Sequence, residues 1–220
     1  MADDTTTAFT LHDRAALRTR YREPHPAAAN KSRPVIDEGP AEFIACSPFF
    51  VLATTSDEGT DASPRGGPPG FVAVLDSQRL AFGDLSGNNR LDSFTNIVEH
   101  GDVGLIFFIP GRGETLRVNG RASVTTDPDV LDRTRIDGKE PKVAVVVDVD
   151  QCFIHCAKAL RRSGLWDPSS WLPTDQTPSA GAVITRQFDT PFTAEQIDAD
   201  LELGYEATMW VEGGDLDPTS

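Results

Sequence analysis

The sequence is short of the features that build membrane spans, disulfide frameworks and secretion signals. Its apolar runs, such as VGLIFFI at residues 103–109, fall well below the roughly 20 residues that cross a bilayer. Three cysteines in 220 residues are too few for a disulfide framework. The first residues, MADDTTTAFTLHDR, lack the basic and apolar regions of a signal peptide. We therefore expect a cytoplasmic protein that does not enter a membrane.

Cations are also scarce. Asp and Glu number 34 against 20 Lys and Arg, which gives a net charge of −14. Residues 181–220 hold nine acidic residues and one cation, Arg186. This balance argues against binding to nucleic acid, because that requires an electropositive face. Cations gather instead at a few positions, namely Arg65, Arg90, Arg112, Arg117, Arg121, Lys158, Arg161 and Arg162. For any one of these arginines, a surface salt bridge is the simpler interpretation.

Metal ligands are sparse as well. Cys152 and Cys156 flank His155 in the segment CFIHC, but the other histidines lie far away in the sequence. A metal site would need further ligands. We therefore expect no metal, and we expect these two thiols to be buried in a core segment.

Short apolar segments separated by turns occupy residues 49–149. Strands are expected at Phe49–Thr55, Thr60–Arg65, Phe71–Leu75, Arg79–Phe82, Val103–Ile109, Thr115–Val124 and Lys142–Val149. The spacing, and the lack of alternating strands and helices, predict an antiparallel barrel or sandwich. The apolar runs at 103–109 and 142–149 predict strands that are buried on both faces.

Helices are expected to flank this β region at Asp13–Tyr21, Glu38–Cys46, Ala157–Ser163 and Thr193–Leu203. The last of them starts with a capping box, Thr193 and Gln196. We predict three parts: an N-terminal arm at residues 1–35, a central domain at 36–180, and an acidic C-terminal helix and tail at 181–220. The last part is expected to pack on the central domain.

The most informative stretch is the turn Ser86-Gly87-Asn88-Asn89-Arg90. It follows a predicted strand and precedes a helix whose apolar stripe is Leu91, Phe94, Ile97 and Val98. Backbone N–H groups at a helix start, an asparagine cap and an adjacent arginine together predict a phosphate site.

Three further groups of polar residues are candidates for ligand contacts. Strand alternation places Ser63 and Arg65 on one face of the strand at residues 60–65. In the same way it places Arg117, Asn119 and Arg121 on one face of the strand at residues 115–124. The alternative for the second set is a solvated outer face that pairs with carboxylates. The third group is Lys158, Arg161 and Arg162, with Trp166 close behind them. That tryptophan would either cover a planar ring or fill the core.

No motif for a nucleophile and its base is present: the chain has no G-x-S-x-G, no Walker loop and no H-E-x-x-H. Glu114 and Asp148 are isolated acids. A site that is rich in cations and glycine but lacks a nucleophile indicates that a cofactor carries the chemistry.

Three sequence blocks, in this order, resemble the pyridoxamine 5′-phosphate oxidase-like flavoproteins: DASPRGGPPGFVAVL, LAFGDLSGNNRLDSFTNI and GLIFFIPGRGETLRVNGRA. A fourth block, FIHCAKALRRSGLW, is similar to one subgroup of that superfamily whose substrate is not agreed. The resemblance covers residues 40–170. It implies a mainly β, α+β fold, a six-stranded antiparallel Greek-key split barrel with flanking helices. It also implies a homodimer that binds FMN at the subunit interface.

The resemblance also assigns roles to single residues. Arg90 would meet the FMN phosphate, with Asn89 where some relatives have a second arginine. Gly83 and Asp84 would face the ribityl chain and ring, and Thr115 would lie near the flavin across the dimer interface. The full set of expected cofactor-binding residues is Ser63, Arg65, Gly83, Asp84, Asn88, Asn89, Arg90, Thr115, Arg117, Arg121, Lys158 and Trp166.

The expected function is FMN-dependent redox chemistry on a small organic molecule, through hydride transfer at flavin N5, with NADH or NADPH as a candidate donor. The C-terminal Trp and Arg motif that reads pyridoxal phosphate in the true oxidase has no match, so pyridoxamine phosphate is not the expected substrate. Two alternatives remain open. One is a non-catalytic carrier or sensor of flavin or haem, with His155 as the axial ligand. The other is a deazaflavin-dependent reductase that uses Arg117, Arg121, Lys158 and Arg161.

Overall fold

The structure is a computed structural model that describes residues 10–85, 87 and 89–210. The chain divides into two units, Met1–Ser32 and Arg33–Ser220. The described part of the first unit holds two short helices, α1 (Arg14–Arg18) and α2 (Pro26–Ala29). The division of the rest at residues 36–180 and 181–220 stays a prediction.

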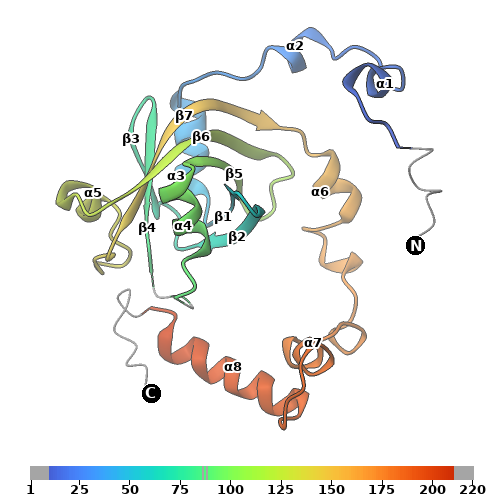
Figure 1. Ribbon diagram of the computed structural model, residues 1–220, viewed down its shortest axis with the longest axis vertical. Helices are drawn as coiled ribbons and strands as arrows, with labels where there is room; N and C mark the ends of the chain where they lie inside the picture. The colour runs from blue at the N-terminus through green and yellow to red at the C-terminus, as the bar shows by residue number, and fades with distance from the viewer. Residues whose placement is uncertain (1–9, 86, 88, 211–220) are drawn as a thin grey trace. The chain divides into compact units, whose positions relative to one another are not determined.

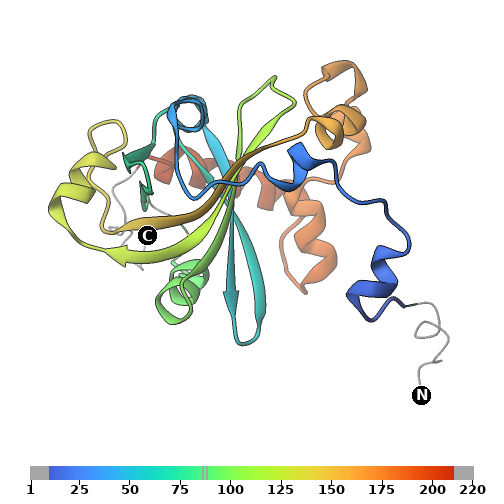
Figure 2. The same ribbon diagram turned by 90° about the horizontal axis from the view of Figure 1, so that it is seen from above.

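The second unit is built on one antiparallel sheet of seven strands in the order β2-β1-β5-β6-β7-β4-β3 (Figure 1). The strands are β1 (Phe49–Ser56), β2 (Gly59–Gly66), β3 (Val72–Asp76), β4 (Arg79–Gly83), β5 (Asp102–Phe108), β6 (Thr115–Thr125) and β7 (Ala144–His155). Each predicted strand segment is a strand. The strands twist strongly (Figure 2), and the sheet is not closed, since no pairing in the described chain joins β2 to β3. The split-barrel class is confirmed, with seven strands where six were expected.

The core lies on one face of this sheet, because side chains alternate between its two faces. Phe50, Leu105 and Phe107 are fully buried. Ile106, between the last two, is exposed, and so is Phe49 on the neighbouring strand. The prediction that residues 103–109 are buried on both faces is therefore wrong for a single chain. Nothing in the described chain covers the outer face at Ile106.

Two helices cover the inner side of the sheet. α3 (Glu38–Cys46) packs on β3, β6 and β7, and it buries Ile44. α4 (Asp92–Glu99) packs on β1, β2 and β6. Its Asn96 side-chain amide donates to the Thr54 hydroxyl at 2.9 Å, which satisfies a polar group buried in the core. These contacts fix the start of α4 beside β2.

The remaining helices follow β6 and β7. They are α5 (Pro128–Arg133), α6 (Lys158–Ser163), the single 3-10 turns η2 (Pro168–Ser170) and η3 (Thr174–Gln176), α7 (Ala180–Gln187) and α8 (Ala194–Thr208). The capping box at Thr193 is confirmed, since both of its hydrogen bonds are present. Helices α2, α5 and α7 are short and were not predicted from the sequence.

The two cysteines around His155 differ in burial. Cys152 on β7 is buried, and this burial raises the pKa of its thiol to about 11. Cys156 is exposed, because it lies just after β7 ends and the chain leaves the sheet. The prediction of a buried thiol is confirmed for Cys152 and wrong for Cys156.

Within the described ranges, no helix combines the length and apolar character needed to cross a bilayer.

Candidate functional site

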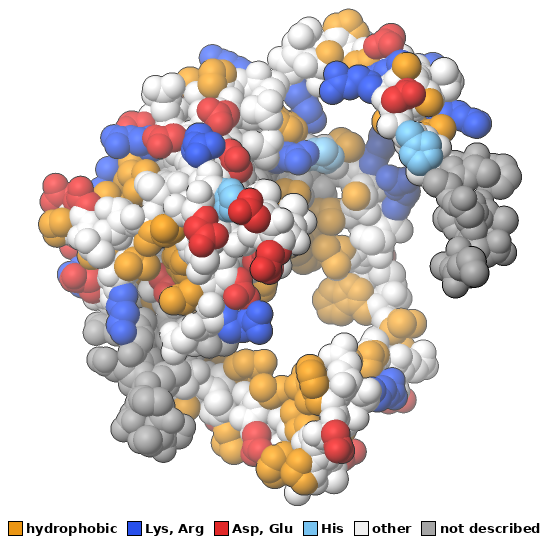
Figure 3. Space-filling model, viewed as in Figure 1, with side chains coloured by type: hydrophobic (Ala, Val, Ile, Leu, Met, Phe, Trp, Pro, Cys, Tyr) orange, Lys and Arg blue, Asp and Glu red, His pale blue; other side chains and the backbone are white. Residues whose placement is uncertain are grey.

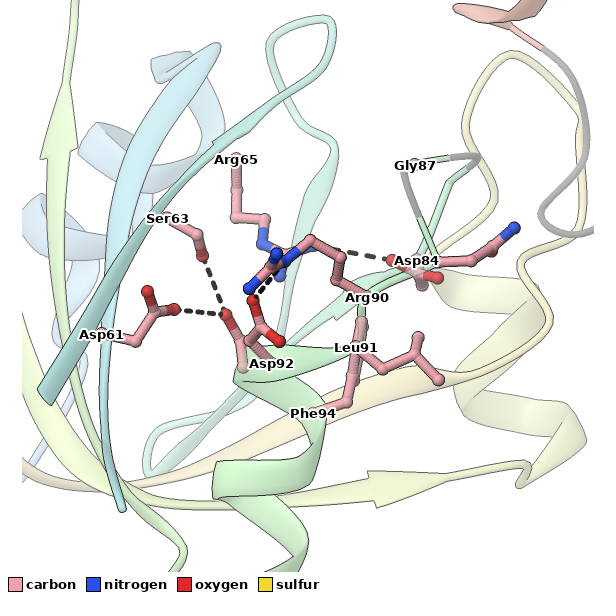
Figure 4. Close-up of a pocket in the computed structure, with 11 residues that line it drawn as sticks. Asp61, Ser63, Arg65, Asp84, Gly87, Arg90, Leu91, Asp92 and Phe94 are labelled. Carbon is pink, nitrogen blue, oxygen red and sulfur yellow. Dashed lines mark hydrogen bonds and ion pairs between the residues drawn. The ribbon is translucent and has the colours of Figure 1, made fainter. Parts of the chain in front are cut away.

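A polar cavity of about 160 Å³ lies between β2 and the loop that joins β4 to α4 (Figure 4). Its lining is Asp61, Ser63, Arg65, Asp84, Gly87, Asn89, Arg90, Leu91, Asp92, Ser93 and Phe94. Five predicted site residues meet here: Ser63, Arg65, Asp84, Asn89 and Arg90. Asn88, a sixth, lies outside the described residues.

Arg65 is the central cation of this cavity. Its side chain is 24% exposed, and its Nη1 lies 3.6 Å from Asp84 Oδ1. The guanidinium also lies over the Phe94 ring, 5.3 Å from the centroid, which is cation–π geometry. Its Nε is buried and has no hydrogen-bond partner among the described residues. A buried guanidinium N–H without a partner is costly, so this atom is suited to an anionic ligand.

Burial acts in opposite directions on the two charged groups. It lowers the pKa of Arg65, although Asp84 and Asp61 oppose the change. It raises the pKa of Asp84, although Arg65 opposes the change. Arginine stays charged because its ordinary pKa is so high. Asp84 is therefore the member of the pair whose proton responds to pH.

A chain of hydroxyl groups runs beside Arg65. The Ser63 and Ser93 hydroxyl oxygens are 3.0 Å apart, and the Ser93 hydroxyl donates to Asp61 at 3.2 Å. Ser93 is buried in the first turn of α4. Asp61, Ser63 and Arg65 project from the same face of β2 because they alternate along the strand.

The loop before α4 carries the second cation. Arg90 Nε lies 2.9 Å from Asp92 Oδ2, and its side chain is 72% exposed. Asn89 and Leu91 on either side both have positive φ, 55° and 60°. The expected asparagine cap is wrong. The N-cap is Leu91 in the left-handed conformation, with no side-chain cap bond, because the chain turns at both positions before the helix begins.

Two further cavities adjoin the first one, and they share Asp84 and Gly87 with it. One of about 230 Å³ is lined in part by Phe71, Phe82 and Gly83. The other, of about 520 Å³, has an apolar lining that includes Leu85, Phe94, Val98, Val124 and Val143. A Cβ on Gly83 would lie 2.8 Å from Pro141 and from the Thr134 carbonyl oxygen. The close packing of these protein atoms is enough to explain why residue 83 is a glycine, and no contact with a ligand is needed to explain it.

The predicted site residues on β6 lie away from this cavity. Thr115 is buried and pairs with His155 on β7. Arg117 lies over the Phe153 ring at 5.9 Å. Arg121 pairs with Asp102 at 2.9 Å and donates to the His100 carbonyl. For Arg121 the structure therefore agrees with the alternative interpretation of this strand face, in which its cations pair with carboxylates instead of a ligand.

Lys158 and Trp166 belong to α6 and the segment after it. The Trp166 indole N–H donates to the Arg112 carbonyl at 2.7 Å, which holds this segment on the β5–β6 turn. Trp166 lines another cavity of about 340 Å³ with Gly111, Gly113 and Arg161. This cavity shares no described lining residue with the Arg65 cavity.

Six residues of the described cavity lining were not among the predicted site residues, and three of them carry hydroxyl or carboxylate side chains: Asp61, Asp92 and Ser93. Asp61 was detectable, because it stands two and four residues before Ser63 and Arg65 and must share their strand face. Ser93 and Asp92 carried no such signal, since their positions depend on the loop conformation. Across the described ranges, no group of three or more His, Cys, Asp or Glu is placed to hold a metal.

Comparison with known proteins gives a family match over much of the chain. The family model of pyridoxamine 5′-phosphate oxidase matches residues 36–156, more than half of the sequence. No curated protein matches the chain significantly.

Three solved structures resemble parts of it. HupZ of Group A Streptococcus is 17% identical with a TM-score of 0.44, and the match covers 54% of this chain and 93% of that one. A proposed pyridoxamine 5′-phosphate oxidase from Lactobacillus delbrueckii is 19% identical with a TM-score of 0.43, covering 56% and 98%. General Stress Protein 26 from Bacillus anthracis is 14% identical with a TM-score of 0.39, covering 51% and 88%. At these values the structural relatives carry no functional assignment.

Proposed function

Because the chain belongs to the pyridoxamine 5′-phosphate oxidase family, we propose that it binds FMN and is an oxidoreductase that reduces a small organic molecule. The proposal rests on one observation above all: the buried, unpartnered Nε of Arg65 in a polar cavity. A phosphate oxygen is the acceptor that this donor lacks.

Other groups of the cavity suit the same ligand. The N–H groups in the first turn of α4, which have no acceptor within the helix, are phosphate donors. Arg90 at the rim adds a second cation. The adjoining cavities offer apolar and glycine-bordered space for a ring system and its ribityl chain, beside Gly83 and Asp84. When bound, FMN supplies hydride transfer at its N5 atom, with NADH or NADPH as candidate donor.

The same proposal includes a homodimer. The outer face of the sheet pairs Phe49 with Phe108 and Val51 with Ile106 across β1 and β5. Phe49 and Ile106 are exposed there. A contiguous apolar face of this kind marks an interaction surface, and a second copy is the partner that closed symmetry favours.

The second copy would also supply charge. Three carboxylates, those of Asp61, Asp84 and Asp92, share the cavity with only two arginines. A phosphate there needs more positive charge. In this proposal Thr115, Arg117, Arg121, Lys158 and Trp166 act on the flavin of the other subunit, across the interface.

The direct test is titration of the purified protein with FMN and with riboflavin, followed by flavin fluorescence. We expect one FMN per chain and clearly weaker binding of riboflavin, which lacks the phosphate. Failure to bind FMN, or equal affinity for the two flavins, contradicts the proposed site. Bound FMN that neither NADH nor NADPH reduces contradicts the oxidoreductase and supports the non-catalytic carrier.

A second expected result concerns Asp84. Its carboxylate competes with a phosphate for Arg65, so Asp84→Asn is expected to tighten FMN binding about fivefold, from an interaction of about 1 kcal/mol. Burial raises the pKa of Asp84, so in the unmodified protein this competition sets in as pH rises through that raised pKa.

The measurement is FMN affinity as a function of pH for both proteins. The ratio of the two affinities should shrink at acidic pH, where Asp84 is protonated. Because both proteins bind the same ligand, titration of the FMN phosphate cancels in the ratio. Asp76→Asn, which removes an exposed carboxylate paired with Arg79 outside the cavity, is the control and should bind like the unmodified protein. A constant ratio contradicts this role for Asp84.

A further inference from the structure

The C-terminal helices α7 and α8 form a defined pair, called here the C-terminal hairpin (residues 180–210). They pack closely at Gly181, where an added Cβ would lie 2.1 Å from the Ala194 carbonyl oxygen. The Gly181 N–H donates to Asp198 Oδ1 at 2.7 Å. The geometry of the two helices is therefore fixed by backbone contact and by a hydrogen bond.

The surface of this hairpin is both apolar and acidic. Its exposed large apolar side chains are Val183, Phe188, Phe192, Leu203, Tyr205, Met209 and Trp210. Figure 3 shows apolar side chains gathered over α7 and α8. The acidic residues of α8 are Glu195, Asp198, Asp200, Glu202 and Glu206, and α8 has no cation. Two helices of this size do not bury enough apolar surface to be stable alone, so this surface needs a cover.

A surface of opposite charge lies at the β5–β6 turn and α6, called here the basic end. Its cations are Arg112, Lys158, Arg161 and Arg162, against one exposed carboxylate in the turn, Glu114. None of these four cations forms an ion pair within the described residues. Leu160 and Trp166 line the cavity of about 340 Å³ beside Arg161.

The basic end is also held in place by its own contacts. Asp167 borders the same cavity, but its carboxylate accepts hydrogen bonds from the Ser169 N–H and hydroxyl. The Trp166 indole is fixed by its bond to the Arg112 carbonyl. The basic end therefore presents cations and apolar side chains on a defined scaffold.

We propose that the C-terminal hairpin of one subunit docks on the basic end of a second copy. Unpaired cations meet the carboxylates of α8, and Leu160 and Leu165 meet exposed apolar side chains of the hairpin. Leu165 is itself exposed. Each chain carries both surfaces, so two copies satisfy each other by a reciprocal exchange around a two-fold axis. This inference rests on the proposed dimer and adds the element that clasps it.

The test is a charge-reversal cycle in the full-length protein. One variant carries Arg161→Glu and Arg162→Glu, another carries Glu202→Lys and Glu206→Lys, and a third carries all four. Hydrogen exchange of the hairpin amides should be about tenfold faster in the first two and return toward the original rate in the third. Arg79→Glu, an exposed reversal elsewhere, is the control. Equal exchange in all of the proteins overturns the proposal.

The identity of the partner is settled by zero-length cross-linking of Lys158 to α8 carboxylates, without added FMN. Heavy and light isotopic forms of the protein are mixed in equal amounts and are unfolded and refolded together so that their subunits mix. They should then give cross-linked peptides with one heavy and one light half. Cross-links within heavy or within light chains alone mean that the hairpin folds onto its own subunit, which overturns the inference. Light scattering separates the two claims. If the protein is a monomer, the proposed dimer is wrong. If it is a dimer that gives no mixed cross-links, only the docking of the hairpin on the second copy is wrong.

Discussion

Replacing Arg65 with methionine is expected to weaken FMN binding by about 10- to 150-fold. The estimate follows from the loss of one charge-assisted contact, worth about 1.5–3 kcal/mol. Arg65 is the less exposed of the two arginines in the described cavity lining, and its buried Nε lacks a partner in the described chain. Methionine keeps the unbranched aliphatic part of the side chain without its charge, so the fold should persist. The measurement is FMN affinity by fluorescence titration, with the melting temperature as the check on folding.

Riboflavin and two other arginines supply the controls. Riboflavin affinity should hardly change in the Arg65 variant, because riboflavin has no phosphate. Arg79→Met, outside every cavity described above, should leave FMN binding intact. Arg90→Met should weaken FMN binding, but less than Arg65→Met, because Arg90 is mostly exposed and already paired with Asp92. The opposite order, or no change with Arg65→Met, would place the phosphate away from β2.

The strands could be predicted because their signal is local. Segments such as Val103–Ile109 are apolar and β-branched, and turn residues separate them from their neighbours, so both their type and their antiparallel pairing follow from short-range chemistry. The capping box at Thr193 is local in the same way. The short helices α5 and α7 were missed because eight residues or fewer give too few turns for a periodic pattern.

The site could be predicted only in part, for a different physical reason. Ser63 and Arg65 share a strand face by alternation alone, and the strand–turn–helix around Arg90 is visible in the sequence. The ion pair of Arg65 with Asp84 depends on how β2 lies beside the end of β4, which local sequence does not encode. The same holds for Asp92, whose pairing with Arg90 follows from the two positive-φ residues of the loop.

Burial of β5 on both faces is not reached within a single chain, and this difference is informative. The single chain covers only one face of VGLIFFI, and in the proposed dimer the second copy would cover the other face. Ile106 is the exposed apolar residue in this run that the proposed partner would cover. Ile106 and the C-terminal hairpin point to the same proposal, a second copy, through independent surfaces.

Gly120→Ala is expected to destabilise the fold by about 3 kcal/mol, the upper range for forcing atoms into a packed site. Gly120 sits at the register shift between β6 and β7, and an added Cβ would lie 2.0 Å from the Asp148 carbonyl oxygen. That oxygen belongs to a backbone that also pairs with Arg79 on β4, so the strain spreads toward the strand that ends at Gly83.

A loss of this size should lower the melting temperature by about 6–12 °C for a chain of this length. The matched control is Gly39→Ala in α3, where an added Cβ meets nothing within 4 Å. Alanine there should leave the melting temperature unchanged or raise it slightly, because it restricts the unfolded chain and favours helix. Equal melting temperatures for the two variants would show that the β7 backbone at Asp148 moves to accommodate the added Cβ without loss of stability. The close approach of β6 and β7 at Gly120 would then not be what holds the register of the sheet.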